Sequence, residues 1–168
     1  MEKELPGRSF VVEEYQRKAL PLFLLWKGIE KFLSMNRQYH YLLGPVSISS
    51  SYSELTRSLI IQFIKQYYYD ARLAQMVHAR RGYEVIHDDD VGILLDHYPV
   101  DINELDKLIS EIEPSHFKVP VLLKKYIKQN ARIIGFNIDP KFNNTLDGLM
   151  MLDLKNLPGD TAFTEIRP

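Results

Sequence analysis

Helical and extended hydrophobic patterns alternate along the chain. Residues 19–34 form a nearly continuous apolar stretch of helical length, and apolar positions recur at helical spacing over residues 55–69. Residues 39–49 between them predict a strand that a Gly-Pro pair interrupts, and residues 7–12 predict an earlier strand. This alternation favours an α/β or α+β fold in which helices flank a mixed sheet.

The second half of the chain predicts further helices and a terminal β-hairpin. The acidic stretch that begins at His87 favours a loop. Asp101 is placed to cap the helix over 102–113, and serines such as Ser53 are placed to cap the helix over 55–69. The remaining predicted elements are a basic amphipathic helix over 72–80, helices over 102–113 and 119–129, and hairpin strands over 132–137 and 148–154. We therefore expect one domain over residues 1–155 and a C-terminal tail over 156–168.

Composition narrows the function classes. With 168 residues and 45% hydrophobic content the chain can bury a core, and a net charge of −1 gives no general attraction to nucleic acid, so we expect no nucleic-acid partner. The absence of cysteine excludes disulfides, thiolate nucleophiles and cysteine zinc sites. No run approaches the ~20 apolar residues that span a bilayer. We expect a cytoplasmic protein that meets the inner face of the membrane peripherally at most.

Two adjacent cations, Arg17 and Lys18, precede the helix over 19–34. The first amide groups of a helix and the positive end of its dipole attract phosphate, so this junction is a candidate anion site. No glycine-rich loop accompanies it, and an ordinary strand-to-helix junction with solvated cations has the same pattern.

Several blocks of the chain resemble one bacterial enzyme family. Residues 4–11, 15–17 and 22–29 resemble its Glu-Leu-Gly-Arg-Ser-x-Val, Tyr-Arg and Leu-x-x-Leu-Trp-x-Gly-Ile pattern, and residues 41–53 and 135–149 resemble two later blocks. The family comprises the acyl-amino-acid N-acyltransferases that make ornithine and glycine lipids. It is often labelled hemolysin and is a branch of the GNAT acyltransferase superfamily.

The resemblance implies a GNAT-like domain that lacks its N-terminal strands. It implies an N-acyltransferase that moves a long, 3-hydroxy fatty acyl chain from acyl carrier protein, or from acyl-coenzyme A, to glycine or ornithine, with no bound cofactor. Such a partial domain is expected to be inactive alone. The alternative is a catalytically silent half-domain that serves as an interaction module for an acyltransferase partner.

The resemblance further implies the superfamily's way of binding the donor, in which pantetheine pairs with a splayed strand and a backbone N–H polarises the thioester carbonyl. Glu4 is then the candidate base for the amine and Tyr52 the candidate proton donor to the thiolate, while Arg17, Lys18, Ser47 and Ser49 bind the donor. The two glycines of the usual coenzyme A signature are missing after Gln16, which favours the single phosphate of acyl carrier protein.

The expected acceptor-binding residues are Arg8, Asn137, Asp139, Asn143, Asn144 and Asp147. Structural roles compete with these assignments. Glu4 can belong to a disordered start, Arg8 can brace its strand, Tyr52 can pack its ring and bond a carbonyl, and the Asn and Asp residues can simply shape a turn.

Other chemistry has weaker support. His87 and the three aspartates after it can attract a divalent cation, but no further ligand at helical spacing supports that, and a solvated acidic loop has the same pattern. The chain has neither the His-x-x-x-x-Asp motif of glycerolipid O-acyltransferases nor Gly-x-Ser-x-Gly. Tyr67, Tyr68 and Tyr69 either contact the membrane from the surface or belong to the core. We also expect dimerisation through the edge of the strand over 8–12.

Overall fold

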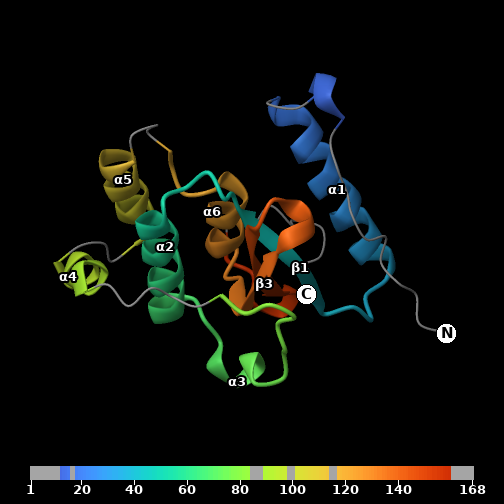
Figure 1. Cartoon of the computed structure of the whole chain (residues 1–168). Coiled ribbons are helices and arrows are strands. Elements are labelled where there is room, and N and C mark those ends of the chain that lie inside the picture. The colour runs from blue at the N-terminus through green and yellow to red at the C-terminus, as the bar shows by residue number, and fades with distance from the viewer. Residues whose placement is uncertain (1–11, 16–17, 84–88, 98–100, 114–116, 160–168) are drawn as a thin grey trace.

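The fold is α+β, as the sequence predicts (Figure 1). The computed structural model describes residues 12–15, 18–83, 89–97, 101–113 and 117–159. Its strands are β1 (Tyr41–Ile48), β2 (Arg132–Asp139) and β3 (Thr145–Asp153). Its helices are α1 (Ala19–Met35), α2 (Glu54–Tyr67), α3 (Ala71–Ala74), α4 (Asp89–His97), α5 (Ile102–Ile112) and α6 (Val121–Lys128), with short 3-10 turns at Glu13–Tyr15, Pro140–Phe142 and Leu154–Asn156.

Within the described residues the sheet has three antiparallel strands in the order β1-β3-β2, so β3, the last of them in the chain, lies in the middle. Strands β2 and β3 form the predicted hairpin, and the register shifts between Ile133 and Gly135. The hairpin turn places Asn143 and Asn144 at φ of 53° and 51°. Asparagine tolerates this left-handed conformation better than most residues because its short amide can bond locally.

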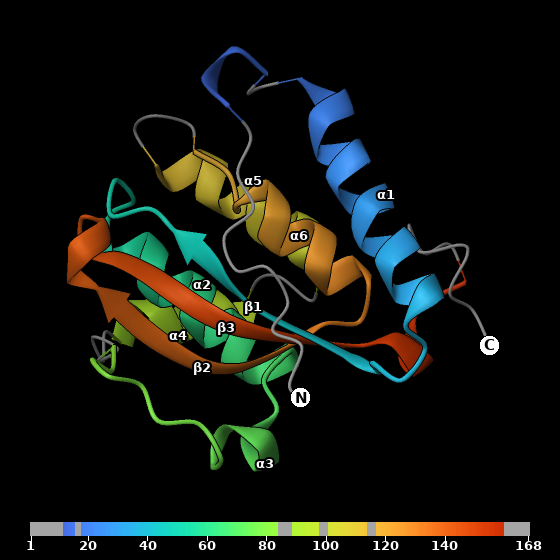
Figure 2. The same cartoon turned by 90° about the vertical axis from the view of Figure 1, so that its right-hand side faces the viewer.

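One face of the sheet packs against the helices, and Figure 2 shows α2 lying behind the strands. Alternate positions of β1 and β3 enter this core, as do the side chains on the inner face of α2, and burying such aliphatic groups drives the packing. The core residues from these elements are Val46, Ile48, Leu59, Ile60, Ile61, Phe63, Ile64, Leu146, Met150 and Leu152. The other positions of β1, from Tyr41 to Ser47, are exposed on the opposite face.

Helix capping follows the sequence signals at two places. The Ser53 hydroxyl accepts a hydrogen bond from the Thr56 amide at 3.2 Å, and the Asp101 carboxylate accepts from the amides of Asn103 and Glu104 at 2.6 and 3.0 Å. Each cap gives partners to amide groups that the first turn of a helix leaves unpaired. The two caps therefore fix where α2 and α5 begin.

Removal of the first cap gives a prediction. We expect Ser53→Ala to lower the free energy of unfolding by at least about 1 kcal/mol, because the first turn of α2 loses its acceptor and the Glu113 carboxylate loses a hydroxyl donor at 2.7 Å. Urea unfolding followed by circular dichroism measures this. The control is Ser34→Ala in α1, where the hydroxyl only bonds the Lys31 carbonyl and alanine suits the helix. Equal stability of the two variants would contradict a capping role for Ser53.

The region between α2 and α5 differs from its prediction. The prediction of a basic helix over 72–80 is wrong, because only Ala71–Ala74 are helical and the chain then continues without regular secondary structure. The acidic loop is wrong in part, because Asp89 and Asp90 begin α4; residues 87 and 88 lie outside the described part. Aspartates are favourable at a helix start, where they face the positive end of the dipole.

Of two predictions about the surface, the structure describes the three tyrosines but not most of the strand edge. Tyr67, Tyr68 and Tyr69 are partly buried and pack on the core, and the Tyr69 ring stacks on Phe136 with centroids 6.2 Å apart. They therefore do not form an exposed aromatic patch. The predicted edge over 8–12 lies outside the described residues except for Val12, and the tail is described only as far as Gly159. In the described part, no helix has the length and apolar character needed to cross a bilayer.

Candidate functional site

A row of polar side chains crosses the sheet on its exposed face. Ser47 of β1 lies opposite Asp147 of β3, which in turn lies opposite Asn137 of β2. The Ser47 hydroxyl donates a hydrogen bond of 2.6 Å to Oδ1 of Asp147. Strand pairing thus brings together residues that are 100 positions apart in the chain.

A cavity of about 770 Å³ lies beside this row. Its walls are largely apolar, and Asp147, Asn137, His78 and Arg80 supply its polar groups. The other lining residues are Pro45, Tyr69, Ala74, Val77, Ala79, Ile134, Gly135, Phe136 and Leu149. Apolar walls with a few convergent polar groups are typical of small-molecule sites.

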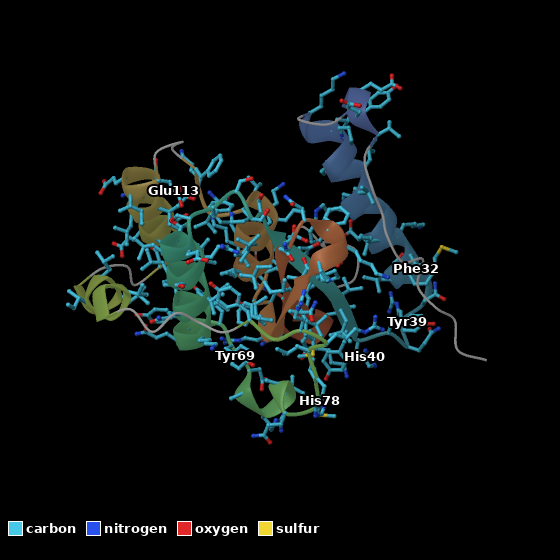
Figure 3. The ribbon with its side chains drawn as sticks, viewed as in Figure 1. Phe32, Tyr39, His40, Tyr69, His78 and Glu113 are labelled. Carbon is cyan, nitrogen blue, oxygen red and sulfur yellow. The ribbon has the colours of Figure 1, made fainter. Side chains whose placement is uncertain are left out.

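The irregular segment after α3 forms the outer wall of this cavity. The Arg81 amide donates to Oδ1 of Asn137 at 2.9 Å, and the Ile138 amide donates to the Arg81 carbonyl at 2.8 Å. The Asn137 amide group also donates to the Ile138 carbonyl at 3.0 Å. Asn137 therefore attaches the segment to β2 and so positions His78, which Figure 3 shows on this segment below the sheet.

Close packing adds to this attachment. A Cβ atom at Gly135 would lie 3.3 Å from Cγ1 of Val77, which is tighter than an ordinary contact. The small residue on β2 thus lets the wall approach the strand.

A second cavity of about 500 Å³ opens further along the same sheet. Tyr41, Leu43 and Met151 form its apolar floor. Its charged lining residues are Arg72, Arg132, Asp70 and Asp153. Both carboxylates accept backbone hydrogen bonds, from Leu73 and Lys155 at 2.9 Å, and Arg132 donates to the Tyr67 carbonyl at 2.8 Å. These polar groups stabilise local turns, so the first cavity is the stronger candidate.

The predicted donor-binding residues do not gather in one place. Lys18 is exposed before α1, and its ammonium lies 5.3 Å from the Tyr15 ring centroid. The Ser49 hydroxyl bonds the Ser51 hydroxyl at 3.1 Å, and neither serine lines a cavity described above. Ser47 bonds Asp147 beside the first cavity. Glu4, Arg8 and Arg17 lie outside the described residues.

Tyr52 has structural partners. Its hydroxyl donates to the Lys118 carbonyl at 2.5 Å, and its ring contacts Phe117 with centroids 5.1 Å apart. Burial raises the pKa of Tyr52, and the charges of Glu113 and Asp106 raise this pKa further. The hydroxyl is thus held away from the first cavity, which fits the packing role that the sequence left open.

The predicted acceptor residues divide into two groups. Asn137 and Asp147 line the first cavity. Asp139 instead accepts from the Lys141 amide at 2.9 Å, and Asn143 donates to the Ser50 hydroxyl at 3.0 Å. Together with the left-handed conformation of Asn143 and Asn144, these bonds indicate that Asp139, Asn143 and Asn144 shape the hairpin turn.

Sequence reasoning missed the rest of the cavity lining. Leu149 could have been found, because in a strand it shares a face with Asp147 two positions earlier. His78 and Arg80 carry no local signal, since only the distant contact with Asn137 brings their segment to the sheet.

Among the described residues, no group of three or more His, Cys, Asp or Glu side chains could hold a metal ion. The side chains of Asp89 and Asp90 and residues 87 and 88 lie outside that description. In the comparisons with known proteins, no family model matches the chain, and neither a curated protein nor a solved structure matches it.

Proposed function

We propose that this domain belongs to an N-acyltransferase that moves a long (3-hydroxy)fatty acyl chain from acyl carrier protein to an amino acid such as glycine or ornithine. One observation carries the proposal: Pro45, on strand β1, lines the same cavity as Asn137 and Asp147. Strand β1 also carries Ser47, which the family resemblance assigns to the donor and which bonds Asp147. A residue assigned to the donor and residues assigned to the acceptor therefore lie beside one cavity.

Strand β1 suits an extended donor. Among the described residues it pairs only with β3, so its second edge is available for the added-strand pairing expected of pantetheine. Pro45 lacks an amide hydrogen. The expected break at Gly44 and Pro45 is not seen, because β1 pairs with β3 without a register shift from Tyr41 to Ile48.

The cavity supplies groups that match an amino acid and an acyl chain. Asp147 is complementary to an ammonium group, and Arg80 is complementary to a carboxylate. Leu149, Phe136 and Val77 offer apolar surface for the acyl chain next to the thioester. The volume of about 770 Å³ lies in the range of roughly 300–1,000 Å³ common for ligand pockets.

The reaction needs a neutral amine, and Asp147 is placed to accept its proton. The amine then forms a bond to the thioester carbon, the carbon–sulfur bond breaks, and the second proton that the nitrogen loses passes to the departing thiolate. Asp147 thereby takes the role of base that the resemblance gives to Glu4, which lies outside the described residues. The Tyr52 hydroxyl already donates to the Lys118 carbonyl, so the proposal does not use Tyr52 as the proton donor to the thiolate.

Donor binding tests the proposal. We expect acyl carrier protein loaded with a 3-hydroxyacyl chain to shift the backbone amide resonances of the non-proline residues over 44–49, because pantetheine would pair with this edge. Carrier protein without its phosphopantetheine arm is the control and should leave these amides unchanged. If neither the acylated carrier nor an acyl-coenzyme A shifts any of them, the acyltransferase proposal fails.

A second function has its own support. Tyr41 and Leu43 are more than half exposed on the open face of the sheet, and such apolar surface suits a protein partner. A catalytically silent interaction module for an acyltransferase partner would use this surface and would not bind the donor. The same titration therefore separates the two functions.

A further inference from the structure

The second cavity, of about 500 Å³, gathers charges of both signs. The guanidinium groups of Arg72 and Arg132 line it together with the carboxylates of Asp70 and Asp153. Among the described residues, no ion pair joins any two of these four groups. Opposite charges that line one cavity without pairing can each bind a group of the opposite sign on a ligand.

Backbone contacts hold three of these side chains in place. Oδ1 of Asp70 and Oδ1 of Asp153 each accept a backbone hydrogen bond of 2.9 Å, and Nη1 of Arg132 donates to a backbone carbonyl at 2.8 Å. A carboxylate has a second oxygen and a guanidinium has five N–H donors. In the described part of the chain, neither these remaining groups nor the guanidinium of Arg72 makes a hydrogen bond. They are available to a ligand.

Strand pairing places an apolar floor between the charges. Leu43 of β1 lies opposite Met151 of β3, which in turn lies opposite Arg132 of β2. Two positions further along β3, Asp153 lies opposite Tyr41. Alternate residues of a strand share one face, so both rows of side chains lie on the open face of the sheet.

The segment with Asp70 and Arg72 forms a wall of this cavity. The Asp70 amide donates to the Ile133 carbonyl at 3.0 Å, and the Ile133 amide donates to the Tyr68 carbonyl at 2.9 Å. Figure 2 shows α3 below β2, and the two elements are in contact. These bonds bring Asp70 and Arg72 to the edge of the sheet where Arg132 begins β2.

The charges and the floor together match one class of small molecule. Guanidinium groups bind a carboxylate, carboxylates bind an ammonium group, and the apolar floor can bury an apolar side chain. A ligand with charges of one sign only would meet as many like charges as opposite ones. We propose that the second cavity binds an α-amino acid with a large apolar side chain. The acceptors of the proposed function, glycine and ornithine, lack such a side chain and are assigned to the first cavity, so the two proposals are independent.

Titration of the full chain with L-phenylalanine tests the inference. The readout is the backbone amide resonances of Leu73 and Lys155, which should shift because these amides bond the carboxylates of Asp70 and Asp153. Phenylalanine amide lacks the carboxylate, 3-phenylpropionate lacks the ammonium group, and glycine lacks the apolar side chain. Each analogue should bind this cavity at least about tenfold more weakly, because it loses a charged hydrogen bond or the apolar contact.

Two variants locate the bound amino acid. Arg72→Gln and Asp153→Asn should each weaken phenylalanine binding about tenfold or more. Asparagine keeps an acceptor for the Lys155 amide, and the Arg72 side chain is exposed, so both variants retain the fold. The matched controls are Arg37→Gln, at an exposed position after α1, and Asp147→Asn, in the first cavity. Both controls should bind phenylalanine like the unaltered protein.

The inference is overturned if phenylalanine shifts neither amide or if the analogues bind as tightly as phenylalanine. It is also overturned if Arg72→Gln and Asp153→Asn bind like the controls. If Asp147→Asn weakens binding as much as Asp153→Asn does, the ligand lies in the first cavity and the inference fails. Donor binding at residues 44–49 is measured separately, so a failure of the proposed function leaves these outcomes unchanged.

Discussion

Replacing Asp147 by asparagine should weaken the binding of glycine or ornithine to the cavity about tenfold or more. The substitution keeps the size of the side chain and its acceptor for the Ser47 hydroxyl, which donates to it at 2.6 Å. It removes the negative charge that the proposed function pairs with the ammonium of the amino acid. Hydrogen bonds to charged groups contribute roughly 1.5–3 kcal/mol, which corresponds to a change in dissociation constant of about tenfold or more.

Calorimetric titration measures this affinity without requiring turnover, which matters because the chain is expected to be inactive alone. The matched control is Asp139→Asn. Asp139 is the last residue of β2, and its carboxylate accepts from the Lys141 amide and so shapes the turn. Amino-acid affinity that is equal in both variants would remove Asp147 from the proposed acceptor site.

The elements that the sequence predicted well carry their own local signals. The apolar run over 19–34 became α1, and Ser53 and Asp101 mark the starts of α2 and α5. The two hairpin strands were predicted correctly, but the turn between them was predicted too long: residues 138–147 were expected in the turn, whereas β2 runs to Asp139 and β3 begins at Thr145. In each case short-range chemistry, such as capping or turn preference, agrees with the final packing.

Elements that depend on distant contacts were not predictable in the same way. The segment after Ala74 has a helical pattern, yet its backbone at Arg81 bonds Asn137 and Ile138 on β2, and Val77 packs at Gly135. These contacts cross more than 50 positions of sequence and replace the internal hydrogen bonds of a helix. The central place of β3 likewise follows from pairing and not from a local pattern.

The candidate site shows the same division. Asn137 and Asp147 were predicted because the block over 135–149 is distinctive, and they share a cavity. His78 and Arg80 reach that cavity only through the irregular segment. Tyr52 was chosen for its place between strand and helix, where its hydroxyl instead bonds the Lys118 carbonyl. Position along the chain thus indicated proximity to the sheet but could not show which hydroxyl was already engaged.

Glu113 connects two helices that lie behind the sheet. It ends α5, and its carboxylate accepts from both the amide and the hydroxyl of Ser53, at 3.0 and 2.7 Å, where α2 begins. The residue is 5% exposed. Burial alone would raise the pKa of Glu113, but the nearby Thr56 hydroxyl and the two hydrogen bonds from Ser53 outweigh burial and hold its pKa below the usual 4.5. The folded protein therefore favours the charged carboxylate.

Loss of this carboxylate should destabilise the protein in a pH-dependent way. We expect Glu113→Gln to lower the free energy of unfolding by roughly 2 kcal/mol at pH 7, because the charged acceptor for both Ser53 donors is lost. The pKa of Glu113 is lowered on folding, so its contribution is fully present above the unfolded value of 4.5 and declines as the pH falls through the lower folded value. The difference between the two proteins should shrink at acid pH. Urea unfolding at pH 7 and near pH 3 measures this, with Glu111→Gln, an exposed change on the same helix, as the control. A difference that is equally large at both pH values would show that the charge of Glu113 does not carry the link between α5 and α2.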